Sequence, residues 1–135
     1  MIQRIQSLYL IIAVLLTLGV FLTPLSTRIF EDPAGWILSG FIAACAFAVA
    51  LSLYSIFRFS DRVDQVKWIN KSMIFQLIAI GVGVAVFFTL GNIGTALMGE
   101  ALGVALLVIA LVLQFLARKG VIADEKLVKS IDRIR

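Results

Sequence analysis

Four long apolar runs, separated by short polar segments, make up most of this chain. They cover residues 5–23, 36–57, 73–90 and 96–117, or 19, 22, 18 and 22 residues in that order. At about 1.5 Å per residue, each run forms a helix of roughly 27 to 33 Å, which matches the hydrocarbon thickness of a bilayer. The pattern predicts an all-α integral membrane protein with four transmembrane helices.

The polar segments predict how these helices are connected. Residues 24–35 read as a short external loop, and Pro24 is expected to end the first helix. Turn-forming residues mark both outer connections, namely Asp32, Pro33 and Gly35 in the first, and Gly91, Asn92 and Gly94 in the second. We therefore expect two hairpins, packed as one transmembrane domain over residues 1–117.

One long polar segment, residues 58–71, separates the two hairpins. Its apolar residues recur at helical spacing as far as Met73, so the third helix is expected to begin near Ser60 and rise out of the bilayer. Eleven of the twelve Lys and Arg residues lie in this segment and near the two termini, whereas Arg28 lies in the first outer loop. The positive-inside rule then predicts that both termini are cytoplasmic.

The last segment, residues 118–135, is too polar to span a membrane. Gly120 is expected to loosen the exit from the fourth helix, and Asp124 and Glu125 suit the first turn of a new helix. Its apolar residues share one face: Leu127, Val128, Ile131 and Ile134. The predicted amphipathic tail lies on the headgroups, folds against the polar segment 58–71, or binds another protein.

Composition supports lipid as the solvent of this chain. Hydrophobic residues make up 61% of it and the mean hydropathy is +1.08, well above the roughly 45 to 50% apolar usage of globular proteins. The net charge of +4 does not predict nucleic-acid binding, because the basic residues flank the apolar runs. Six of them are the predicted contacts to anionic headgroups or a partner: Arg58, Arg62, Lys67, Lys71, Arg118 and Lys119.

Small residues at helical spacing mark the predicted packing faces. They are Gly40, Ala44, Ala48 and Ser52 in the second helix, and Gly99 and Gly103 in the fourth. Such residues let two helices approach closely in lipid, although a dimer interface or a ligand slot is the alternative use. Gln76 and Gln114 are expected at similar depth, where they would share a hydrogen bond.

Glu100 is the candidate ionisable site. It lies about four residues into the fourth helix, where a carboxylate in the first turn interacts favourably with the helix dipole. The alternative is a carboxylate that couples transport to a proton or a cation, since ionisable groups in a bilayer tend to be functional.

Residues that would indicate catalysis or a cofactor are missing from the sequence. The chain has no His, the commonest metal ligand and general base, and its single Cys45 lies in an apolar run as a predicted buried hydrophobe. Neither a nucleophile with its base nor a phosphate-binding loop is found. We therefore expect no enzymatic activity, no cofactor and no metal.

The two ends of the chain resemble a known family. The opening MIQRIQ and a close containing Asp124, Glu125, Leu127, Val128, Ser130, Asp132 and Arg133 are similar to domain of unknown function 4293. That family comprises small bacterial inner-membrane proteins of similar length with four predicted spans. The resemblance implies the same fold and membrane, and it implies no activity.

Together these observations predict a non-enzymatic scaffold or accessory subunit. Its cytoplasmic segments would contact anionic lipid or another membrane protein. The alternative is a small transporter or channel subunit, assembled as a homo-oligomer, that uses Glu100.

Overall fold

The computed structural model describes residues 2–89 and 96–134, which are helical throughout except for short connections. The long helices are α1 (Ile2–Gly19), α3 (Trp36–Phe57), α4 (Arg62–Thr89) and α5 (Ala96–Ile134). A 3-10 turn, η1 (Val20–Leu22), and a short helix, α2 (Pro24–Phe30), connect α1 to α3. The expected turn at Gly91, Asn92 and Gly94 lies outside the described residues.

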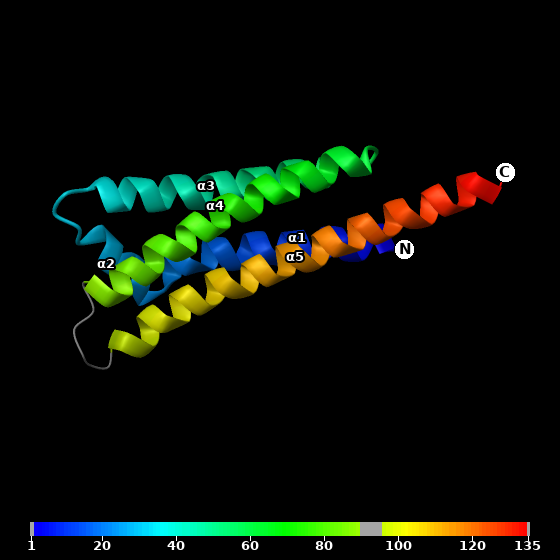
Figure 1. The fold of residues 1–135 in the computed structure, drawn as a ribbon. Coiled ribbons are helices and arrows are strands. Elements are labelled where there is room, and N and C mark those ends of the chain that lie inside the picture. Colours follow the sequence, from blue (N-terminus) through cyan, green and yellow to red (C-terminus); the bar gives the residue numbers. More distant parts are fainter. Residues whose placement is uncertain (1, 90–95, 135) are drawn as a thin grey trace.

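The four long helices form one antiparallel bundle (Figure 1). Helix α3 packs on α4, α4 on α5, and α5 on α1. The chain ends and the α3–α4 connection lie at one end, here called the terminus end, and α2 lies at the other, the α2 end. All four helices are long and apolar enough to cross a membrane, by length and composition.

The buried residues of α4 and α5 follow a heptad pattern. On α5 they are Glu100, Gly103, Leu107, Ala110, Gln114, Ala117, Val121 and Asp124, and on α4 they are Gln65, Ile69, Ser72, Gln76, Ala79, Gly83 and Val86. Spacings of three and four alternate along both lists, and this is the pattern of helices that cross at a shallow angle with a left-handed twist. We call the inward line of α5 its seam.

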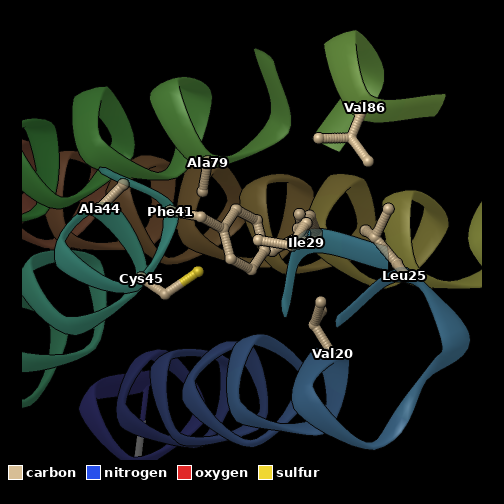
Figure 2. Packing of buried hydrophobic residues seen from close by; sticks show 9 residues of the cluster. Val20, Leu25, Ile29, Phe41, Ala44, Cys45, Ala79 and Val86 are labelled. Atoms are coloured by element: carbon tan, nitrogen blue, oxygen red, sulfur yellow. The ribbon is translucent and has the colours of Figure 1, made fainter. Parts of the chain in front are cut away.

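Residues 24–30 form a helix, so the prediction that they are loop is wrong. Pro24 begins α2 instead of only ending α1, because its fixed φ suits the first helical position. Leu25 and Ile29 of α2 enter the core beside Phe41 and Cys45 (Figure 2). Cys45 is buried, as expected for a small hydrophobe.

The turn predicted after α2 is confirmed. The carboxylate of Asp32 accepts hydrogen bonds from the backbone N–H groups of Ala34, at 3.2 Å, and of Ile37, at 3.1 Å. Gly35 adopts a left-handed φ of 70°, which glycine tolerates better than other residues. These features reverse the chain into α3.

The predicted break at Gly120 is wrong, because α5 is continuous over 39 residues. Gly120 instead allows α1 to approach α5: a Cβ at this position would lie 2.9 Å from Cγ of Gln6. The tail is thus a direct extension of the fourth long helix. We call its last part, residues 125–134, the arm.

The predicted packing faces are only partly correct. Ala44, Ala48 and Ser52 are buried in α3, but Gly40 is exposed and a Cβ there would meet open space. The predicted pair in α5, Gly99 and Gly103, packs against α2 rather than against another long helix. Gly40 lies outside the groove of small residues, which begins one turn later at Ala44, and the neighbouring Phe41 contacts the core instead.

Candidate functional site

Polar side chains occupy the middle of the bundle. The Thr17 hydroxyl lies 3.2 Å from Oε1 of Gln76, and Nε2 of Gln76 donates to the backbone carbonyl of Leu107 at 3.1 Å. These contacts tie α1, α4 and α5 together. The groups are neutral, and such bonds between membrane helices contribute roughly 0.5 to 1 kcal/mol each.

A second polar cluster joins α3, α4 and α5. The hydroxyl oxygens of Ser52 and Ser72 are 2.7 Å apart, and Nε2 of Gln114 donates to Ser52 at 3.3 Å. Gln76 and Gln114 therefore bond to different partners, and the prediction that they bond to each other is wrong. The two glutamines lie at different depths, because Gln76 meets α5 at Leu107, about two helical turns from Gln114. Oε1 of Gln114 is buried and has no partner among the described residues.

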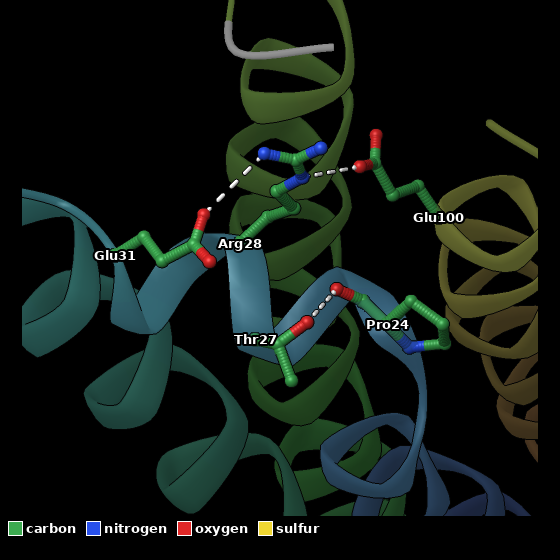
Figure 3. A network of polar contacts seen from close by, with 5 residues as sticks. All are labelled: Pro24, Thr27, Arg28, Glu31 and Glu100. Atoms are coloured by element: carbon green, nitrogen blue, oxygen red, sulfur yellow. Dashed lines mark hydrogen bonds and ion pairs between the residues drawn. The ribbon is translucent and has the colours of Figure 1, made fainter. Parts of the chain in front are cut away.

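Glu100 is buried at the α2 end and forms an ion pair that sequence reasoning missed. Its carboxylate accepts a hydrogen bond from Nε of Arg28 at 3.0 Å (Figure 3). The Glu100 side chain is 2% exposed, and the Arg28 side chain is 29% exposed. Nη1 of Arg28 also lies 3.4 Å from Glu31. One feature of the sequence could have indicated this pair: Arg28 is the one basic residue in the sequence of the two outer connections.

Helix α2 holds Arg28 in place through contacts with glycines of α5. A Cβ on Gly99 would lie 2.5 Å from Cγ of Pro24, and one on Gly103 would lie 2.6 Å from Cβ of Leu25. Because such distances are too short for real Cβ atoms, only glycine fits here. The GxxxG spacing thus lets the short helix α2 pack directly on α5.

At the terminus end, Asp64 gathers charged and aromatic groups from α3 and α4. Arg58 donates to its Oδ2 through Nε at 3.1 Å and Nη2 at 2.6 Å, and Trp68 donates at 3.3 Å. The hydrogen bond to Asp64 raises the pKa of the Arg58 guanidinium further above its ordinary value, so this group stays charged. Lys71 lies 4.0 Å above the Trp68 ring.

The six predicted contact residues differ in their surroundings. Arg58 and Arg118 bond within the chain, since Nε of Arg118 donates to Asn70 at 2.7 Å and joins α5 to α4. Lys67, Lys71 and Lys119 are exposed, and Arg62 is half-buried. Lys71 and Lys119 also contact aromatic rings, since Nζ of Lys71 lies 4.0 Å from the Trp68 ring centroid and Nζ of Lys119 lies 5.0 Å from that of Phe115.

A buried polar contact between the two ends of the chain was also missed by sequence reasoning. Nε2 of Gln6 donates to Oδ2 of Asp124 at 3.0 Å, and both residues are buried. Gln6 lies in the opening MIQRIQ and Asp124 in the closing motif. This contact fixes α5 against α1 at the point where the arm begins.

An open groove, here called the terminal groove, lies between the arm on one side and the α3–α4 connection with the first turn of α4 on the other. Its volume is about 760 Å³. It is lined by Phe59, Ser60, Asp61, Arg62 and Val63 on one side, and by Glu125, Val128, Lys129 and Asp132 on the other. The groove combines exposed apolar side chains with both signs of charge.

Comparison with known proteins identifies the family. Residues 35–134 match the family model described as Domain of unknown function (DUF4293). The chain belongs to the DUF4293 family. The match includes α3, α4, the arm and the tail motif, whereas the opening MIQRIQ lies outside it. No curated protein and no solved structure matches the chain.

The arm of this DUF4293 member carries the seam beyond the bundle. Val128 and Ile131 continue the three-and-four spacing past Asp124, but no other helix of the described chain covers them. Ile131 is 60% exposed and Ile134 is 87% exposed. Among the described residues, no group of three or more His, Cys, Asp or Glu side chains could hold a metal ion.

Proposed function

We propose that this protein is a non-enzymatic membrane scaffold that presents its arm and terminal groove to a partner protein. The observation that carries the proposal is the continuity of α5, which runs from the bundle into the arm without a break. A continuous helix transmits the orientation of the bundle to the arm. The arm is therefore a rigid extension and not a loose tail.

The surface of the bundle supports a position across a membrane. Large apolar residues are exposed all around it, among them Leu15, Phe47, Ile78 and Val112, and in water such a surface would cause aggregation. The Lys and Arg residues gather at the terminus end, with Arg28 at the α2 end. This distribution supports a cytoplasmic terminus end, and the family resemblance supports a bacterial inner membrane.

The length of the tail supports a protein partner over lipid headgroups. Residues 118–134 extend for roughly 25 Å as a helix, whereas the headgroup layer is only about 6 Å thick on each side. Lys119, close to the apolar span, suits an anionic headgroup. Leu127, Ile131 and Ile134 lie further out, in water, where an exposed apolar face needs a partner.

The transporter alternative draws less support from the geometry. Glu100 already has Arg28 as its counter-charge, and Pro24 packs directly on Gly99 beside it. A coupling carboxylate must instead be reached by its ion. A proton-dependent flux in reconstituted vesicles that Glu100→Gln abolishes would favour the transporter.

The decisive experiment is purification of the tagged protein from its native membrane in a mild detergent, with the particle mass and its components determined. We expect one stoichiometric partner. The double variant Leu127→Asp, Ile131→Asp should lose it, because two charges then interrupt the apolar face. Lys126→Ala, Arg133→Ala is the matched control, since it changes the net charge by the same two units on the side of this helix that faces away from Leu127 and Ile131. A wild-type particle without any partner would contradict the scaffold.

A further inference from the structure

The terminal groove is an acidic hollow on an otherwise basic end. Asp61, Glu125 and Asp132 line it, together with Arg62 and Lys129. Lys129 is already paired with Glu125 at 2.6 Å. Asp132 makes no ion pair with any described residue, so its carboxylate is available to a basic group from outside.

The groove also has an apolar lining from both walls. Phe59 contributes from the α3–α4 connection, Val63 from the first turn of α4 and Val128 from the arm, and all three are exposed. Val128 stands on the seam, the line along which α5 buries its side chains against α1 and α4 further down. A helix packed here would continue the internal packing of the bundle by one further layer.

The position of the groove limits what can enter it. Just below it, the hydrogen bond from Arg118 to Asn70 holds α5 against α4. No helix can therefore descend from the groove between these two helices into the bilayer. The occupant has to arrive from the aqueous side.

Resting on the proposed function, we infer that the terminal groove binds one amphipathic helix of a partner protein located in the aqueous phase. Its apolar side chains, spaced three and four residues apart, pack on Val63 and Val128. A Lys or Arg beside this stripe pairs with Asp132. Helix-in-groove binding with such anchors is a common mode of peptide recognition.

The test places a photo-crosslinking amino acid at Val128 of the full chain in its native membrane, with Ser130 on the outward side of the arm as the control position. We expect Val128 to cross-link to one segment of one other protein, and Ser130 to give little product. The captured segment should be an amphipathic helix with a basic flank. Asp132→Lys should lower the yield about tenfold or more, because like charges then face each other. Reversing the partner's basic residue to Glu should restore it.

Three results would overturn the inference. They are a cross-link from Val128 to a second copy of this chain, a cross-link to lipid, and the absence of a cross-link while a partner still copurifies. The third result would contradict binding in the groove but would leave the scaffold proposal in place. If no partner copurifies with the wild-type protein, both the groove inference and the scaffold proposal are wrong. An unchanged melting temperature of the Asp132→Lys protein checks that its fold is intact.

Discussion

The two ends of the bundle differ in where their charged side chains lie, with a partly buried ion pair at one end and largely exposed charges at the other. At the α2 end Arg28 pairs with the buried Glu100, and glycines of α5 let α2 pack directly on that helix. At the terminus end Lys67, Lys71 and Lys119 are exposed, and an open groove separates the arm from the α3–α4 connection. The charged groups of the α2 end pair within the fold, whereas at the terminus end the groove is open and the arm is exposed. Substitutions should therefore affect stability most at the α2 end, and substitutions in the exposed arm should affect association.

The largest loss of stability is expected from Arg28→Ala, which leaves the Glu100 carboxylate buried without a counter-charge. Removing one partner of a buried pair costs about 3 kcal/mol. Unfolding in a detergent titration measures this loss. The double variant Arg28→Ala, Glu100→Gln should recover a large part of it. If the single and double variants were equally destabilised, the ion pair would not be the cause.

Gly103→Ala should come next, with a loss of about 1 to 3 kcal/mol from overpacking against Leu25 and Thr23. Its added Cβ would lie 2.6 Å from Cβ of Leu25. Gly40→Ala is the matched control, since that position lies within helix α3 and faces open space. It should be neutral or slightly stabilising, because alanine favours helix more than glycine does. Equal losses in the two proteins would argue against close packing of α2.

Gln6→Ala should cost about 1.5 kcal/mol, the usual contribution of a hydrogen bond to a charged group. Because this bond holds α5 where the arm begins, hydrogen exchange of the amides in residues 121–134 should also become faster. Gln3→Ala, at a position in the same opening motif, is the comparison. Unchanged exchange in the arm would mean that Gln6 does not hold α5.

The smallest effect on stability is expected at the terminus end. Leu127→Asp, Ile131→Asp should change the free energy of unfolding by less than about 0.5 kcal/mol, as is usual for exposed positions. The same variant should abolish partner retention. A large loss of stability would show that the arm is part of the fold, and the contrast between the two ends would then disappear.

Some of this structure could be read from the sequence because apolar length and helical spacing are local properties. The second helix was predicted at residues 36–57 and the start of the fourth at Ala96, and both agree with the structure. Helix α2 was missed because a seven-residue helix is not stable alone, so its contacts with Gly99 and Gly103 decide its conformation. The break at Gly120 was predicted wrongly for a similar reason. The glycine is needed there because Gln6 of α1 packs against it, and the local sequence does not show this contact.

The sequence by itself determined the all-helical fold class, the four long apolar helices and the unequal distribution of basic residues. These features depend only on composition and periodicity. Tertiary structure alone decided which polar groups meet. Arg28 and Glu100 are 72 residues apart, and Gln6 and Asp124 are 118 apart. Pairings over such separations depend on how helices rotate and slide against one another. That geometry is set by the packing of the whole bundle, and no local pattern encodes it.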